Sequence, residues 1–349
     1  MRPAAGILLL LQVATLLAAG CRHVERAELR AVEPIPERLL RAYRPRQAPF
    51  HFVLEPGNDN GHYYESFRFR FDTYSEMEGD FKQVVGTYYR TRKEVPGGRA
   101  PLLCFAPILA GAVDNYLACR VFAHWAAREG FSSFYVHQDE IILTADRDGI
   151  VLERLWRDST LDNIKALDLL TQLPEVDAER LGSLGISLGA LRNVVLLAVE
   201  PRLRANVLCL GGAGLSKILA TSRENLVLRY IRGREAADGI TREQVGQDLD
   251  AFVRSDPAVF ARYVANDRTL LFLGAIDNKV PYAAGLDLYE GLGRPEAYFI
   301  LLGHYTGMLA APFSASRMFA YLHARLDEGI DSCAAPPGSD RAASSPKPD

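Results

Sequence analysis

The amino-acid sequence predicts an α/β fold in which a doubly wound, mostly parallel β-sheet carries helices on both faces. Three observations predict this fold class. Short, continuous apolar runs recur along the chain, as in strands that are buried on both faces. Stretches with helical periodicity separate these runs, so that strands and helices alternate. Ahead of them, two segments have the pattern of antiparallel strands.

The predicted antiparallel strands come first in the chain. Phe67, Phe69 and Phe71 alternate with charged residues, which is typical of a strand with one buried face. A second strand is expected at residues 83–92, after a turn at residues 78–80. The sheet should therefore begin with N-terminal antiparallel strands.

Six apolar runs predict the parallel strands. They cover residues 102–105, 134–136, 184–186, 207–210, 270–273 and 298–301. Helical stretches are expected between them at residues 114–128, 152–173 and 190–199. Because helices that connect parallel strands cross over the sheet, this alternation places helices on both of its faces.

One connection is too long for a simple crossover. Residues 215–267 separate two core strands, whereas a βαβ connection needs only about 10–12 residues. A capping box at Thr241–Gln244 begins a helix on which Val245, Leu249 and Phe252 follow at helical spacing. We expect a small helical cap over the ends of the strands, with this apolar stripe facing the core or the substrate.

The chain begins with a predicted signal peptide, residues 1–20. Met1–Arg2 is followed by an apolar run at Gly6–Gly20, which is shorter than the roughly 20 residues that span a bilayer. Leu17–Cys21 resembles the lipobox of bacterial lipoproteins. That resemblance implies that Cys21 is lipidated and anchors the protein to a bacterial membrane in the cell envelope, at the outer membrane or facing the periplasm. An ordinary cleavage site with an incidental Cys21, or a retained short anchor, are the alternatives.

The remaining boundaries follow from composition. Residues 21–48 are rich in Arg, Glu and Pro and predict a tether with a short helix at 36–43. Residues 49–330 form the predicted main domain. Residues 331–349 contain Pro, Ser, Ala and charged residues without periodicity, which predicts a disordered tail.

Charge and cysteine spacing exclude several classes of partner. The net charge is −3, without a basic stripe, so no nucleic-acid partner is expected. Cys104, Cys119, Cys209 and Cys333 do not have the spacing of a metal site, and Asp146–Gly149 lacks the further oxygen ligands of a calcium loop. The sequence predicts neither a metal nor a cofactor. Two of the cysteines could pair, but their spacing does not say which.

A candidate nucleophile lies in Gly185–Gly189, which matches Gly-x-Ser-x-Gly around Ser187. An apolar strand precedes this serine and a helical stretch follows it, which is the setting of a nucleophile elbow. Such a turn is so tight that both flanking positions need glycine. A serine hydroxyl needs a base to accept its proton, and the base needs an acid to hold its tautomer.

The base and the acid are predicted from their places after the last two strands. Of the seven histidines, His304 alone directly follows the final core strand. Asp277 follows the strand before it. The order Ser187, Asp277, His304 is the order in which α/β-hydrolases carry their triad. These three residues are therefore the predicted catalytic triad.

Residues 101–326 resemble the α/β-hydrolase superfamily, in particular its dienelactone hydrolase and acetyl xylan esterase-like branch. Besides the elbow, Leu173–Gly182 and Asp256–Pro257 carry the resemblance. True dienelactone hydrolases use a cysteine nucleophile, so Ser187 points to the esterase side. The resemblance implies an α/β-hydrolase fold and a serine esterase.

The same resemblance places the oxyanion hole. One backbone N–H should belong to Leu188, directly after the nucleophile. The other should belong to Leu109, in the loop after the first core strand. Relatives often have His-Gly-x-Gly in this loop, where this chain has Pro107-Ile108.

The leading functional hypothesis is hydrolysis of a small-molecule or polymer-borne carboxylic ester through an acyl-enzyme on Ser187. An amidase or peptidase with the same triad is the alternative. Peptidases of this fold often carry a propeller of roughly 40–50 residues per blade, for which the region before Pro101 has no room. A non-catalytic envelope lipoprotein on a hydrolase scaffold is a third possibility, against which the complete triad argues.

Overall fold

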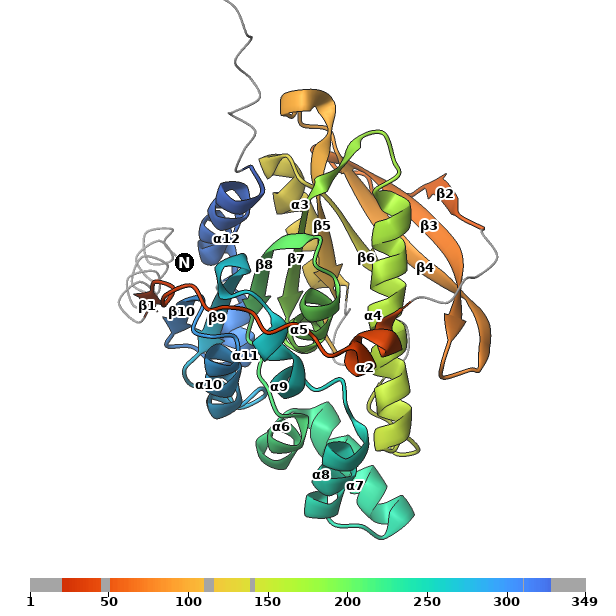
Figure 1. The fold of residues 1–349 in the computed structure, drawn as a ribbon, viewed down its shortest axis with the longest axis vertical. Helices are drawn as coiled ribbons and strands as arrows, with labels where there is room; N and C mark the ends of the chain where they lie inside the picture. Colours follow the sequence, from red (N-terminus) through yellow and green to blue (C-terminus); the bar gives the residue numbers. More distant parts are fainter. Residues whose placement is uncertain (1–20, 45–50, 110–115, 139–141, 310, 328–349) are drawn as a thin grey trace, which may run out of the picture.

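The computed structural model describes residues 21–44, 51–109, 116–138, 142–309 and 311–327. In this part of the chain ten strands form one sheet in the order β1-β10-β9-β8-β7-β5-β6-β4-β3-β2 (Figure 1). They are β1 (Cys21–Val24), β2 (Val53–Pro56), β3 (Tyr64–Ser75), β4 (Asp80–Thr91), β5 (Ala100–Ala106), β6 (Ser132–Val136), β7 (Val176–Ile186), β8 (Leu203–Cys209), β9 (Thr269–Gly274) and β10 (Glu296–Ile300).

The strands β5 to β10 are parallel, and the antiparallel strands lie at the two edges of the sheet. At one edge β2, β3 and β4 form an antiparallel ribbon that joins the sheet through β4 and β6. At the other edge β1 runs antiparallel to β10. The predicted α/β class, with its mostly parallel sheet and N-terminal antiparallel strands, is confirmed.

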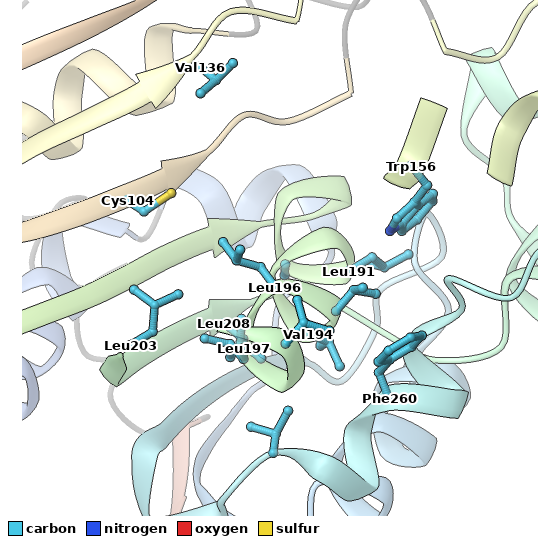
Figure 2. Close-up of a cluster of buried hydrophobic side chains, with 14 of the residues drawn as sticks. Cys104, Val136, Trp156, Leu191, Val194, Leu196, Leu197, Leu203, Leu208 and Phe260 are labelled. Atoms are coloured by element: carbon cyan, nitrogen blue, oxygen red, sulfur yellow. The ribbon is translucent and has the colours of Figure 1, made fainter. Parts of the chain in front are cut away.

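Helices cover both faces of the sheet. The longer ones outside the cap are α3 (Leu117–Glu129), α4 (Gly149–Leu170), α5 (Leu188–Val199), α10 (Tyr282–Gly291) and α12 (Ala311–Leu326). Side chains of α3 and α12 pack in one core cluster, whereas those of α4, α5 and α10 pack in another. Figure 2 shows part of the second cluster, with Leu191 and Val194 of α5 among its members.

Alternate residues of the central strand β5 enter the two clusters. Leu102 and Cys104 belong to the cluster on the α5 side, and Leu103 and Phe105 belong to the cluster on the α3 side. All four are at most 1% exposed. The continuous apolar run therefore reflects a strand with two buried faces, as the sequence predicts.

Four helices connect β8 to β9, within the predicted cap at residues 215–267. They are α6 (Leu215–Thr221), α7 (Asn225–Asp238), α8 (Arg242–Phe252) and the short α9 (Pro257–Phe260). Figure 1 shows α6, α7 and α8 together at the lower end of the molecule, beyond the strands. The capping box at Thr241 is present, with both of its reciprocal hydrogen bonds.

The apolar stripe of α8 differs from its prediction at one residue. Val245 and Leu249 are buried, but Phe252 is 45% exposed. Phe252 is the last residue of α8, and its ring borders a surface hollow beside Ile150 and Arg254. The buried face of α8 ends before its last residue. Helical spacing alone therefore predicted a buried environment for Phe252, whereas its side chain is partly exposed to solvent.

Residues 21–44 pack against the main domain, although the sequence predicts a tether there. Besides the pairing of β1, the Arg30 guanidinium donates to the carbonyl oxygens of Gly291 and Val264, at 2.8 and 3.1 Å. The Tyr43 hydroxyl lies 2.5 Å from Ser255 Oγ in the interior. Backbone pairing and Arg–carbonyl bonds leave no periodic pattern in the sequence, which explains the difference. The short helix expected at 36–43 is present as α2 (Glu37–Leu40) and a following 3-10 turn (Arg41–Tyr43).

The predicted signal peptide at residues 1–20 and the predicted tail at residues 331–349 lie outside the described residues. None of the helices that the structure describes is both long and apolar enough to cross a bilayer. Cys104 and Cys209 are buried free thiols, and Cys119 is buried as well.

Candidate active site

The turn between β7 and α5 carries Ser187 in a strained backbone conformation. Its φ of 57° and ψ of −123° lie where residues with a side chain are seldom found. A Cβ on Gly185 would lie 2.5 Å from the Gly189 carbonyl oxygen, and a Cβ on Gly189 would collide with the Ala106 carbonyl oxygen. The two glycines therefore allow β5, β7 and α5 to approach closely enough to hold the serine at the tip of the turn.

The structure brings His304 and Asp277 to the same edge of the sheet as Ser187. Asp277 follows β9, and His304 follows β10 as the first residue of α11 (His304–Leu309). His304 Nδ1 lies 2.7 Å from Asp277 Oδ2, and His304 Nε2 lies 2.9 Å from Ser187 Oγ. The carboxyl ends of parallel strands meet at one edge, which is why residues 117 positions apart form one hydrogen-bonded series.

The Asp277 carboxylate is held by more than the histidine. Its Oδ1 accepts hydrogen bonds from the backbone N–H groups of Lys279 and Val280, at 2.8 and 3.1 Å. The side chains of Asp277 and His304 are only 2% and 6% exposed. With Oδ1 occupied, Oδ2 faces the imidazole and accepts a hydrogen bond from its Nδ1–H, which keeps that proton on the ring. His304 Nε2 is then free to accept the proton of the serine hydroxyl.

The two predicted oxyanion donors lie at the same cavity. Leu109, Leu188, Ser187 and His304 all line it, with Asp277 behind the histidine. Leu188 is the first residue of α5, so its N–H has no acceptor within the helix. Leu109 follows β5, whose end packs against the elbow at Gly189. The structure therefore brings the five predicted residues together, while the loop that follows Leu109, at 110–115, lies outside the described residues.

The cavity itself is mostly apolar and has a volume of about 120 Å³. Sixteen of its 21 lining residues are aliphatic or Trp. The cap contributes from three helices, for example through Ile218, Val227 and Leu249. The main domain contributes Trp156 and Leu191, among others. The cap thus forms part of the wall around Ser187.

Three polar lining residues were missed by the sequence analysis, and we call them the polar rim: Glu224, Lys279 and Tyr305. The Tyr305 hydroxyl donates to Glu224 Oε2 at 2.6 Å, and Lys279 Nζ lies 3.9 Å from the same oxygen. Burial, followed by the Glu224 carboxylate, raises the pKa of Tyr305 to about 12. The position of Tyr305 next to His304 was the one available signal, because Glu224 comes from the cap and no spacing relates it to the triad.

No protein-family model and no curated protein matches this chain. Solved structures do match it. Acetyl xylan esterase from Paenibacillus sp. R4 is 17% identical, with a TM-score of 0.60 over 84% of this chain and all of that chain. Acetyl xylan esterase 1 from Thermoanaerobacterium sp. JW/SL YS485 is 18% identical, with a TM-score of 0.55 over 83% of this chain and 96% of that chain.

Acylaminoacyl peptidase from Pyrococcus horikoshii also matches. It is 17% identical, with a TM-score of 0.52 over 75% of this chain and 41% of that chain. At these identities the matches show the fold, and the chain has the α/β-hydrolase fold that the sequence predicts.

Proposed function

We propose that this protein is a serine hydrolase that cleaves carboxylic esters through an acyl-enzyme on Ser187. The observation that carries the proposal is the hydrogen-bonded series from Ser187 Oγ through His304 to Asp277, at the wall of an apolar cavity. Binding alone requires neither a strained serine nor a buried carboxylate behind the histidine. This argues against a non-catalytic lipoprotein on the same scaffold.

The geometry supports the following sequence of steps. His304 Nε2 accepts the Ser187 hydroxyl proton as Oγ bonds to the ester carbonyl carbon, and Asp277 stabilises the imidazolium that forms. The N–H groups of Leu109 and Leu188 donate to the oxyanion. The carbon–oxygen bond to the alcohol then breaks, and the alkoxide takes the proton from His304. His304 then takes a proton from a water molecule as the water oxygen bonds to the acyl carbonyl carbon. The bond between that carbon and Ser187 Oγ breaks, Oγ takes the proton from His304, and the acid leaves.

The names of two matched structures add support for an ester as the scissile group, because both are acetyl xylan esterases. We therefore propose a small-molecule or polymer-borne ester as the substrate. The mechanism above uses side chains and backbone groups of this chain and involves no cofactor or metal.

The proposal is tested with short 4-nitrophenyl esters and a fluorophosphonate probe that labels activated serines. We expect Ser187→Ala to lose labelling and at least about 10⁴-fold of turnover with an unchanged melting temperature. Ser216→Ala is the matched control, because Ser216 lies on α6 and does not line the cavity. This variant should keep both the labelling and the turnover of the parent protein. Near-native turnover by folded Ser187→Ala would overturn the mechanism.

An amidase or peptidase with the same triad is the alternative, and the match to acylaminoacyl peptidase is consistent with it. Amide hydrolysis needs His304 to protonate a leaving amine rather than an alkoxide. Paired esters and anilides with one acyl group separate the two activities. A kcat/KM for the anilide equal to or above that for the ester would favour the alternative.

We also propose that Cys21 carries lipid and anchors the protein to a bacterial membrane in the cell envelope. The Leu17–Cys21 pattern and the apolar run before it support this location. Cys21 is also the first residue of β1, so an anchor at this residue would join the folded domain directly.

A further inference from the structure

The cavity beside Ser187 is larger and more apolar than an acetyl ester requires. An acetyl group places one methyl carbon beyond the carbonyl. The cavity measures about 120 Å³, and an apolar cavity of about 150 Å³ in another protein binds benzene, a group of six carbons. We propose that the site is selective for esters of an apolar acyl chain of about six carbons; this rests on the proposed function.

The wall of the cavity fits hydrocarbon and does not fit a sugar. Ile218, Val227 and Leu249 from the cap and Trp156 and Leu191 from the main domain are each at most 6% exposed and line it. Figure 2 labels Trp156 and Leu191, which belong to the same buried apolar cluster. Sugar hydroxyls placed against such a wall would lose their hydrogen bonds to water without replacement, whereas a hydrocarbon chain gains by leaving water.

The position of the polar rim indicates that the apolar part of the cavity holds the acyl group of the ester. The leaving alkoxide takes its proton from His304, so the alcohol must lie on the side of that residue. Tyr305 is the next residue, its ring centroid is 5.7 Å from that of His304, and it joins Glu224 and Lys279. The polar groups therefore border the path of the alcohol. The acyl chain is left with the apolar wall formed by α5 and the cap.

Chain-length dependence tests this inference. Each methylene that enters the cavity should raise kcat/KM about fourfold, the equivalent of roughly 0.8 kcal/mol per buried CH₂. Across 4-nitrophenyl acetate, butanoate, hexanoate, octanoate and dodecanoate we expect a rise on the order of 10²-fold from acetate to hexanoate. We expect no further gain beyond about eight carbons. A parallel series of alkyl acetates, from ethyl to octyl, tests the alcohol side and should be nearly flat.

Two residues of α8 provide a matched pair of variants. Leu249→Ala enlarges the cavity and should move the optimum to longer chains, whereas Phe252→Ala, on the exposed end of the same helix, should leave the profile as it is. Val227→Phe places a larger side chain in the cavity from α7 and should move the optimum to shorter acyl chains. This second variant tests the inference even if Leu249→Ala does not fold.

The possible failures are distinguishable. Hydrolysis that depends on Ser187 but is fastest with acetate, or flat across the acyl series, overturns the acyl-chain inference and leaves the proposed function intact. If kcat/KM instead rises with chain length across the alkyl acetates, the apolar cavity holds the alcohol, and its assignment to the acyl group is overturned. No hydrolysis dependent on Ser187 with any ester overturns the proposed function itself.

A second inference comes from a different surface, which we call the mouth patch: Ile276 and Leu301. Both side chains are 61% exposed. They belong to the loops that follow β9 and β10, and Ile276 N–H donates to the Leu302 carbonyl oxygen at 3.3 Å, so the loops are adjacent. Ile276 immediately precedes Asp277. The mouth patch therefore lies beside the catalytic groups.

The N-terminus of the described chain reaches the same place. In the pairing of β1 with β10, Cys21 is the partner of Ile300, the residue before Leu301. Directly before Cys21 the sequence is the apolar run Gly6–Gly20. A lipid on Cys21 or a retained apolar segment would thus begin next to the mouth patch. We infer that the mouth patch rests on the surface of a lipid bilayer, with the entrance to the catalytic site facing the membrane.

Fluorescence quenching tests this orientation in the full-length protein reconstituted into vesicles that contain brominated phospholipid. Leu301→Trp should be quenched well beyond the parent protein, which has two tryptophans. Phe81→Trp is the control, because Phe81 is 46% exposed on β4, in the ribbon at the opposite edge of the sheet. If Leu301→Trp shows no more quenching than the parent protein, the inference is overturned; this would also be the result if the chain's own N-terminal segment covered the mouth patch. Equal quenching at residues 301 and 81 would overturn it as well.

Discussion

His304 Nδ1 lies 2.7 Å from Asp277 Oδ2, and the other oxygen of that carboxylate is occupied by two backbone N–H groups. The histidine ring is thereby fixed from the side opposite Ser187. The β-strands that precede the two residues, β9 and β10, are adjacent and parallel. The relationship is therefore set by the central sheet.

Asp277→Asn should lower kcat by about 10⁴-fold without unfolding the protein. Asparagine can present its NH₂ group to the imidazole, which favours the tautomer with its proton on Nε2 and removes the base that Ser187 needs. The measurement is kcat on the best ester, with the melting temperature as the control for folding. A loss below tenfold would show that the carboxylate does not orient His304 as proposed.

Gly189→Ala should lower the free energy of unfolding by about 3 kcal/mol or more, because its Cβ would collide with the backbone at Ala106. Gly246→Ala is the control. Gly246 lies inside α8, the nearest atom to its added Cβ is 3.7 Å away, and alanine favours helix by up to about 1 kcal/mol. Urea denaturation of both variants should give opposite signs. Equal, small effects would contradict the steric account of the elbow.

Asp162 should make the protein less stable as pH rises. Burial raises the pKa of its carboxyl from 3.8 to about 6, against the effect of Lys82, whose Nζ lies 3.0 Å away. The folded state therefore keeps this proton to a higher pH than the unfolded state. The contribution to stability is complete below about pH 4 and is lost as pH rises through about 6, on the order of 2–3 kcal/mol.

Comparing the parent protein with Asp162→Asn isolates the contribution of the Asp162 carboxyl to stability, because all other titratable groups are present in both proteins. Denaturant unfolding of both proteins at pH 4.5 and 7.5 should show the parent losing more stability, or gaining less, than the variant between the two values. An identical pH dependence would mean that Lys82 holds the folded-state pKa of Asp162 at its ordinary value.

Cys21→Ser should release the protein from the membrane. A lipoprotein's several acyl chains hold it firmly, whereas one chain anchors only marginally, and serine provides no thiol for lipidation. We expect the parent protein in the detergent phase, with a lipid mass on Cys21, and the variant in the aqueous phase or unprocessed. An unmodified thiol at a mature N-terminal Cys21 would overturn the lipidation proposal.

The sequence by itself determined the fold class and the residues of the candidate catalytic triad. Burial of parallel strands on both faces imposes continuous apolar runs, and the elbow imposes glycine at positions 185 and 189. The strand order then brings the ends of β7, β9 and β10 to one edge, so Ser187, Asp277 and His304 were predictable from their positions after these strands.

Only the tertiary structure decided how the cap, the N-terminal segment and the polar rim are placed. Helical spacing grouped Phe252 with Leu249, but α8 ends at the surface, so one side chain is exposed and the other lines the cavity. Arg30 bonds to Gly291, which is 261 positions further along the chain. Glu224 accepts a hydrogen bond from Tyr305, which is 81 positions further along. Periodicity records which face of an element is buried. It does not record which distant carbonyl or hydroxyl a single polar side chain meets, because that depends on how the whole chain packs.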